Sequence, residues 1–207
     1  MDVRHIKEYF DSHGRSSLVF ESIDSTNTYM KKNRQKVGTL ALALSQTAGH
    51  GQFDRVFESP QSGLYMSLCV KYIPDFPMTL AAANAAVDAL CELLNLNCRV
   101  KWVNDIIADS RKLCGILAES VFCGDDSVTV VGFGINVKKG GLSDEVSRIA
   151  VSLEELVETE LPDDILPVLA LKIAENLEKE LKKGKEEVIS RYRQICLSDI
   201  PENAVFI

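Results

Sequence analysis

No apolar run in this sequence approaches the ~20 residues that a membrane-spanning helix needs. The N-terminal stretch MDVRHIKEYFDSH lacks the apolar centre of a secretory signal peptide. The six cysteines include no CxxC pair, and none has histidines nearby at the spacing of zinc ligands. These absences argue against a secreted, membrane-spanning or zinc-binding protein. They predict a cytoplasmic chain whose cysteines are mostly reduced core thiols.

Positive charge is also in short supply. The chain has 23 Lys and Arg against 30 Asp and Glu, which gives a formal net charge of −7. It shows no basic stripe and no helix-turn-helix pattern, so we expect no nucleic-acid partner. With 207 residues and 46% apolar residues, the chain fits a single well-buried domain, because single cores usually stop growing beyond about 250 residues.

Hydrophobic periodicity predicts an α+β domain. Helices are expected over residues 3–10, 28–35 and 76–94. From Ser152 to Cys196 the sequence is helical, with an amphipathic stretch over 162–184, and Ser152 with Glu155 has the pattern of a capping box. Strands are expected over residues 16–22, 39–45, 63–72, 98–102, 106–108, 112–122 and 127–137. Short strands joined by Asp, Asn and Gly turns favour a mixed, mainly antiparallel sheet covered by helices on one face.

Five polar clusters lie at the ends of these elements, where a rigid scaffold can present side chains. They are STN at 25–27, Gln46 with GHGQFDR at 49–55, KWVND at 101–105, RKLCGIL at 111–117 and GFGIN at 132–136. Taken singly, each also fits a structural role, such as a helix cap, a hairpin turn or a close approach of two strands. The residue types of the five clusters and their order along the chain, taken together, favour a functional role.

The series STN, QTAG.G followed by an arginine and SP..GLY.SL, KW.ND, K..GIL.E and G.GINV resembles the catalytic domain of biotin protein ligases, or holocarboxylase synthetases. The resemblance covers about residues 18–138. It implies a class II synthetase-like catalytic domain over residues 1–197 and a truncated tail, 198–207, where relatives carry a small β-barrel. Some relatives also carry a helix-turn-helix domain, and we expect none here, because the residues ahead of 18 show no such pattern.

The activity implied by the resemblance has two steps. Such ligases join the biotin carboxylate to the α-phosphate of ATP, which releases pyrophosphate and leaves biotinyl-5′-AMP. A lysine of a carboxylase's biotin-carrier domain then attacks this mixed anhydride. Both steps gather negative charge on phosphate oxygens, so catalysis depends on positioned donors, a lysine and Mg²⁺. The implied cofactors are ATP and Mg²⁺, the implied protein partner is the carrier domain, and a homodimer is among the assemblies found in relatives.

The resemblance also implies roles for individual residues. The positions that match biotin-binding residues are Ser25, Thr26, Asn27, Gln46, Gly49, His50, Lys112 and Gly115. The positions that match nucleotide-binding residues are Gly51, Gln52, Arg55, Trp102, Asn104, Asp105 and Asn136. Lys112 and Arg55 are the expected catalytic residues, and Asp105 is the expected contact to Mg²⁺.

The glycine-rich loop departs from the family pattern. Family members usually read GRGRRGR where this chain reads GHGQFDR, so His50, Gln52 and Phe53 replace arginines and Asp54 replaces a glycine. Most of the loop's positive charge is lost, and the loss of one preorganised donor typically costs on the order of 10²–10³ in rate. Two alternatives therefore stay open beside an active ligase. One is a catalytically impaired relative that binds biotin, and the other is a lipoate or other acyl ligase of the same superfamily.

Overall fold

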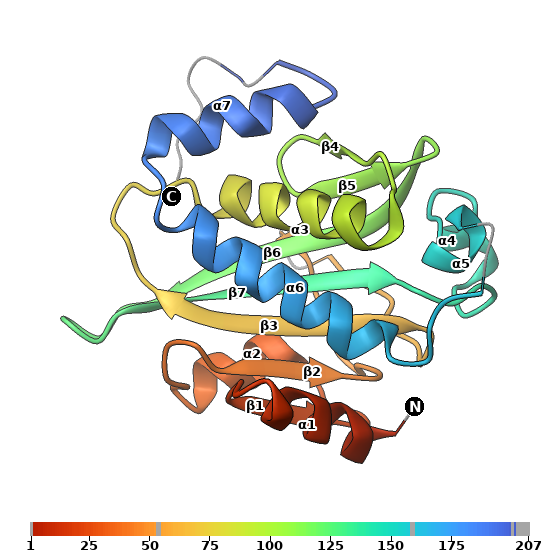
Figure 1. Cartoon of the computed structure of the whole chain (residues 1–207), viewed down its shortest axis with the longest axis horizontal. Helices are drawn as coiled ribbons and strands as arrows, with labels where there is room; N and C mark the ends of the chain where they lie inside the picture. The colour runs from red at the N-terminus through yellow and green to blue at the C-terminus, as the bar shows by residue number, and fades with distance from the viewer. Residues whose placement is uncertain (1, 53–54, 158–159, 200, 202–207) are drawn as a thin grey trace.

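The computed structural model describes residues 2–52, 55–157, 160–199 and 201 of the chain. Its centre is a seven-stranded sheet in the order β1-β2-β3-β7-β6-β5-β4 (Figure 1). The strands are β1 (Ser17–Phe20), β2 (Leu40–Ala43), β3 (Gly63–Lys71), β4 (Arg99–Lys101), β5 (Asp105–Ala108), β6 (Arg111–Val121) and β7 (Val128–Asn136). β1 and β2 run parallel and the other neighbours run antiparallel, which confirms the predicted mixed, mainly antiparallel sheet.

Seven helices surround the sheet in the described part of the chain. They are α1 (Val3–Ser12), α2 (Thr26–Lys32), α3 (Met78–Leu94), α4 (Asp144–Ser147), α5 (Leu153–Leu156), α6 (Ile165–Glu180) and α7 (Lys185–Ile195). The capping box predicted from Ser152 and Glu155 is present at the start of α5. The short α4 was not predicted, and α2 begins two residues earlier than expected because Ser25 caps it. None of the described helices combines the length and the apolarity that crossing a membrane requires.

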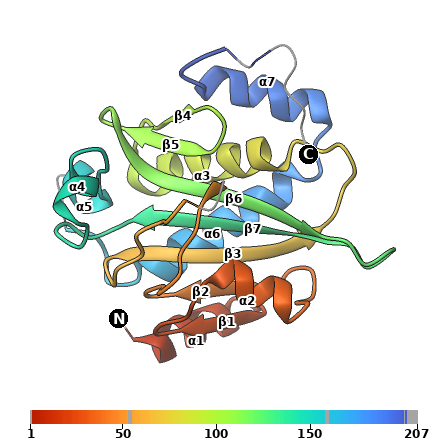
Figure 2. The same cartoon turned by 180° about the vertical axis from the view of Figure 1, so that it is seen from behind.

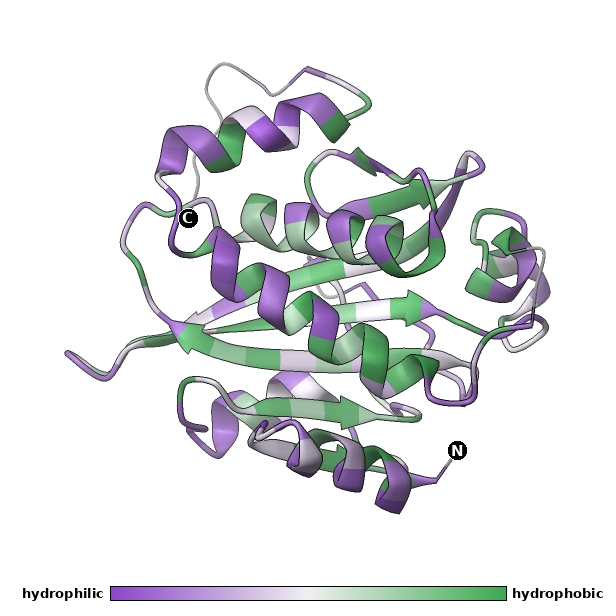
Figure 3. Ribbon diagram, in the orientation of Figure 1, coloured by the Kyte–Doolittle hydropathy of each residue, from purple (hydrophilic) through white to green (hydrophobic). Residues whose placement is uncertain are grey.

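The main core lies on one face of the sheet, where α1, α3, α6 and α7 pack. Helix α3 is rich in alanine and is mostly buried from Met78 to Leu90, and its small side chains let it lie close to both the strands and α6. The strands of the sheet are coloured largely as hydrophobic in Figure 3. The buried thiols of Cys98, Cys114 and Cys196 belong to this core, while Cys69 is buried elsewhere in the sheet. All six cysteines are free, as predicted.

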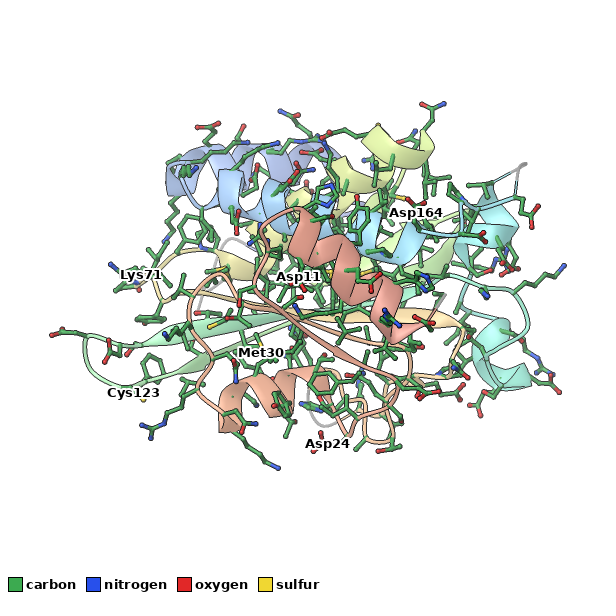
Figure 4. The ribbon with its side chains drawn as sticks, turned by 60° about the horizontal axis from the view of Figure 1, so that its bottom comes forward. Asp11, Asp24, Met30, Lys71, Cys123 and Asp164 are labelled. Carbon is green, nitrogen blue, oxygen red and sulfur yellow. The ribbon has the colours of Figure 1, made fainter. Side chains whose placement is uncertain are left out.

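The other face of the sheet carries the short helix α2, which lies in front of the strands when the molecule is seen from behind (Figure 2). A small apolar cluster of Met30, Ala41, Cys69 and Val130 fixes α2 to the sheet. Figure 4 shows Met30 between α2 and the strands, with α1 on the opposite side. The long helices therefore cover one face, as predicted, and the other face is left largely free for a binding site.

Candidate active site

A cavity of about 200 Å³ opens on the face that carries α2, over β6 and β7. Most of the residues expected at the site line it. They are Ser25, Thr26, Asn27, Gln46, His50, Gly51, Gln52, Arg55, Asn104, Asp105, Lys112 and Gly115. Gly49, Trp102 and Asn136 are outside this lining, and each has a supporting contact described below. The five sequence clusters thus meet in one region of the fold.

The polar end of the cavity is built at the start of α2. The backbone N–H of Thr26 donates to Gln46 Oε1 at 2.8 Å, and the Thr26 hydroxyl lies 3.2 Å from the same oxygen. Gln46 Nε2 donates to Ser59 Oγ at 3.2 Å. These bonds fix the orientation of the Gln46 amide, so its oxygen faces α2 and its nitrogen faces the loop.

The Asn27 amide is held against the sheet from both sides. Its Nδ2 donates to the carbonyl oxygen of Leu117 at 3.2 Å and to Glu119 Oε2 at 2.9 Å. Its Oδ1 accepts from Ser67 Oγ at 2.6 Å. A Cβ on residue 132 would overlap Oδ1 of this amide, so glycine at 132 makes room for it. Both amide hydrogens of Asn27 are therefore used within the protein.

Two glycines form the middle of the cavity floor. Gly115 of β6 and Gly134 of β7 are direct neighbours in the sheet register. The ring of Phe57 lies against both, because a Cβ on Gly115 would be 2.9 Å from Phe57 Cε2 and one on Gly134 would be 2.6 Å from Phe57 Cε1. Sequence reasoning missed Phe57. The only signal for it was an aromatic residue shortly after Arg55, and nothing local shows which glycines it meets.

The cationic end of the cavity is the Lys112 ammonium. Its Nζ lies 2.7 Å from Asp105 Oδ1, and the two side chains are 32% and 28% exposed, so the pair is within reach of a ligand. Nζ also lies 5.4 Å from the centroid of the Phe57 ring. Asn136 donates from Nδ2 to the carbonyl oxygens of Lys112 and Val151, both at 3.2 Å. It therefore positions the Lys112 backbone and does not itself face the cavity.

The glycine-rich loop returns on itself over the cavity. Gly51 N–H donates to the Arg55 carbonyl at 2.8 Å, and Phe57 N–H donates to the Gly49 carbonyl at 2.9 Å. A Cβ on Gly49 would be 2.6 Å from the Phe57 carbonyl oxygen, so Gly49 permits this close return of the chain. Arg55 is exposed and lines the cavity. The substitutions at Phe53 and Asp54 lie outside the described residues.

The KWVND turn is anchored from behind. Trp102 packs edge-on against Tyr192 of α7 with ring centroids 6.0 Å apart, and the Tyr192 hydroxyl donates to the Val103 carbonyl at 3.0 Å. Asn104 Nδ2 donates to the Ile116 carbonyl at 2.8 Å. Trp102 thus supports the turn from the helical side of the sheet. Asn104 ties the turn to β6, next to the glycine floor.

One further side chain contacts residues of the site from outside the cavity lining and was given no role from the sequence. Glu119 of β6 pairs with Lys31 Nζ at 2.5 Å and lies 3.8 Å from His50 Nε2, in addition to its bond with Asn27. Burial opposes its ionisation, but the hydrogen bonds from Lys31 and Asn27 hold the pKa of the Glu119 carboxyl below its usual range. The only signal for it was the glutamate of the GIL.E pattern.

The described residues contain no group of three or more His, Cys, Asp or Glu side chains that could hold a metal ion. Among the described residues that line the cavity, the acidic group is the Asp105 carboxylate, which is paired with Lys112. Mg²⁺ commonly binds through one or two carboxylates together with waters and substrate phosphates. The site therefore fits an ion that arrives on phosphates better than a resident metal centre.

Comparison with known proteins gives a consistent result. Residues 19–136 match the model of the biotin/lipoate A/B protein ligase family. The bifunctional ligase/repressor BirA of Bacillus subtilis is 36% identical over 148 residues, which cover 66% of this chain and 45% of that protein. The biotin–[acetyl-CoA-carboxylase] ligase of Mycobacterium tuberculosis is 32% identical over 129 residues, which cover 58% of this chain and 46% of that protein. The chain spans less than half the length of these two relatives.

A solved structure is similar over most of the fold. The biotin protein ligase from Aquifex aeolicus in complex with biotin and ATP superposes with a TM-score of 0.76 and 26% identity. The match covers 88% of this chain and 79% of that one.

Proposed function

This chain belongs to the biotin/lipoate A/B protein ligase family, as the sequence resemblance predicted, and we propose that it is an ATP-dependent biotin–protein ligase. It would form biotinyl-5′-AMP and transfer the biotinyl group to a lysine of a biotin-carrier domain. The observation that carries this proposal is the layout of the cavity, which joins a polar end at Thr26 and Gln46 to a cationic end at Lys112 across an apolar, glycine-lined floor. Biotin has a cyclic urea at one end, which suits the polar end of the cavity, and a carboxylate at the other, which suits the cationic end.

The urea of biotin would lie at the start of α2. Ser25, Thr26 and Gln46 supply hydroxyl and amide groups there, and a few polar fixings within apolar walls are the usual pattern of a small-molecule site. The ring system and acyl chain would pass over Gly115 and Gly134, where the missing side chains leave the backbone open. A ligand that lies against these glycines has to displace the Phe57 ring.

In the first step, a biotin carboxylate oxygen forms a bond to the α-phosphorus of ATP as the bond to pyrophosphate breaks. The Lys112 ammonium is the cation best placed to stabilise the phosphate charge, and Asp105 orients it. Arg55, on the loop, also lines the cavity and adds a second cation. Mg²⁺, when bound, neutralises charge on the phosphate oxygens, and Asp105 is the residue of this chain that would hold it.

In the second step, the neutral amine of the acceptor lysine attacks the carbonyl of the anhydride, AMP leaves, and the amine loses its proton. Gly51, Gln52 and Asn104 line the cavity near Lys112 and Arg55 and would border the nucleotide. Trp102 and Asn136 would act without lining the cavity. Trp102 supports the KWVND turn by packing against Tyr192, and Asn136 holds the Lys112 backbone through a hydrogen bond. A homodimer remains a prediction from the family resemblance.

A biotin-binding relative with little adenylation activity is the second candidate. It is favoured by the loop, because His50 lies toward Glu119 and Arg55 is the one guanidinium among the described residues that line the cavity. Retention of the Lys112–Asp105 pair favours the ligase. The Mycobacterium tuberculosis relative and the Aquifex aeolicus structure named above are both biotin ligases, which favours biotin over lipoate as the acyl substrate.

The test is to incubate the purified protein with biotin, ATP and Mg²⁺ and to look for biotinyl-5′-AMP by mass spectrometry. Lipoate replaces biotin in a parallel reaction. We expect adenylate with biotin and none with lipoate. Biotin binding without any adenylate would establish the impaired relative instead, and adenylate from lipoate alone would contradict the proposed substrate.

A further inference from the structure

Behind the polar end of the cavity, the Glu119 carboxylate receives hydrogen bonds from two donors on α2. Lys31 Nζ is 2.5 Å from Oε1, and Asn27 Nδ2 is 2.9 Å from Oε2. The Glu119 side chain is 25% exposed, and its hydrogen bonds hold the pKa of the carboxyl below its usual range, so the group is ionised at neutral pH. A charged, partly buried acceptor of this kind constrains every hydrogen bond that continues from it.

An ionised carboxylate can only accept, so Asn27 must turn its NH₂ group toward Glu119. The second hydrogen of that NH₂ group goes to the Leu117 carbonyl at 3.2 Å. Asn27 Oδ1 therefore faces the other way, where Ser67 Oγ lies at 2.6 Å. Because Oδ1 is an acceptor, the Ser67 hydroxyl has to donate its single hydrogen to it.

With its hydrogen committed, Ser67 Oγ is left as an acceptor toward Thr26 Oγ1, 2.8 Å away. The other neighbour of the Thr26 hydroxyl is Gln46 Oε1 at 3.2 Å, which is also an acceptor. Whether the Thr26 hydroxyl donates to Ser67 Oγ or to Gln46 Oε1, its hydrogen is used inside the protein. The lone pairs of Thr26 Oγ1 are then what the threonine side chain can offer to a ligand.

We infer that Glu119 is a positioning residue that sets the donor and acceptor direction of the polar end, so that Thr26 presents an acceptor oxygen to the ligand. Gln46 Nε2 keeps one hydrogen without a protein acceptor in the described part of the chain, so it adds a donor. A ligand that matches this pair has an N–H group beside a carbonyl oxygen, as in a cyclic urea. The dithiolane ring of lipoate has neither group. This inference rests on the proposed function for its ligand.

The chain contains a matched control for the Glu119 cluster. Glu92 of α3 also accepts from a lysine and an asparagine, Lys172 Nζ at 2.5 Å and Asn176 Nδ2 at 3.3 Å. That cluster lies between α3 and α6, on the helical face of the sheet. Glu119→Gln and Glu92→Gln therefore make the same chemical change on the two sides of the sheet.

The test measures biotin affinity by calorimetry and the steady-state constants of adenylation for the unaltered protein and both variants. A glutamine amide at position 119 can donate as well as accept, so it no longer fixes the direction of the hydrogen bonds that reach Thr26, and E119Q should weaken biotin binding by about tenfold. The KM for biotin should rise with it, while kcat and the KM for ATP stay within about twofold. Dethiobiotin, which keeps the urea and lacks the sulfur, should lose affinity by the same factor. E92Q should change none of these.

A second variant, Ser67→Ala, removes the link between Asn27 and Thr26 and leaves the Glu119 ion pair in place. Ser67→Ala should also weaken the binding of biotin and leave the KM for ATP unchanged. It takes the place of E119Q in the test if E119Q does not fold. A third readout needs no ligand. The side-chain amide protons of Asn27, assigned by their loss in Asn27→Asp, should shift in the NMR spectrum of E119Q and stay in place in E92Q.

Unchanged biotin affinity in both E119Q and S67A would overturn the inference. An equal loss for biotin and ATP, or a fall in kcat alone, would overturn it too, because either result is what a general disturbance of the site produces. If the unaltered protein binds no biotin, the proposed function fails and the recognition role of Glu119 fails with it. That result is distinguishable because it appears before any substitution is made.

Discussion

The two faces of the central sheet are made by the same strands and have opposite character. Along β7, Val131, Phe133 and Ile135 point into the apolar core beneath α3 and α6, while Gly132 and Gly134 between them face the cavity. Side chains alternate across a strand, so one short stretch supplies both surfaces. The core face therefore stabilises the fold by filling space, whereas the site face functions by leaving space open.

The largest expected effect on stability comes from the core face. Ile135→Ala should lower the free energy of unfolding by about 2–5 kcal/mol, because it removes a fully buried side chain and leaves a cavity. Urea denaturation measures this loss. The biotin affinity of the folded fraction should change less than about threefold, and a loss of affinity as large as the loss of stability would break the proposed separation of the faces.

The largest expected effect on catalysis comes from Lys112→Ala on the site face. Removal of a preorganised cation should slow formation of biotinyl-5′-AMP on the order of 10²–10³-fold, with little change in unfolding. Lys172→Ala is the control, because Lys172 is also a partly exposed lysine paired with a carboxylate, but on the helical face. Single-turnover rates with biotin and ATP give the measurement. Equal slowing in the two variants would contradict the assignment of Lys112.

A smaller effect, on both biotin affinity and stability, is expected for Gly132→Ala. The new Cβ would overlap the Asn27 amide, so biotin affinity should fall about tenfold, and overpacking of this kind typically costs about 1–3 kcal/mol of stability. Gly184→Ala is the matched control, because a Cβ there meets nothing within 4 Å. Calorimetry with biotin and thermal unfolding report the two quantities, and full biotin affinity in Gly132→Ala would show that Asn27 is not needed.

The smallest expected effect is a pH dependence of stability. The hydrogen bonds from Lys31 and Asn27 hold the Glu119 pKa in the folded protein below its usual value of about 4.3, so the ionised carboxylate stabilises the fold above that pH. This contribution is lost as pH falls through the folded-state pKa. The difference in unfolding free energy between the unaltered protein and Glu119→Gln should therefore be constant near pH 7 and shrink below about pH 4.5. A difference that grows on acidification would contradict the ionised state of Glu119.

The sequence predicted the strands and long helices well, because each depends on periodicity within a short window. It also predicted most of the residues that line the cavity, because they lie in sequence motifs that resemble those of biotin protein ligases. Phe57 could not be found this way, since its partners Gly115 and Gly134 are distant in the chain and meet it only in the folded sheet. Trp102 and Asn136 were expected near the nucleotide from the family resemblance, and the contacts that they make in the structure are with Tyr192 and with backbone carbonyls. Whether they also touch a nucleotide stays a prediction.

The central claim is that the glycine face of the sheet is where biotin is bound and activated. The most direct measurement is a crystal structure of this protein grown with biotin and ATP. We predict biotin or its adenylate over Gly115 and Gly134, with the Phe57 ring moved aside, the urea at Thr26 and Gln46, and the activated carboxyl at Lys112. A ligand bound in the reverse direction, or one bound away from these glycines, would contradict the account.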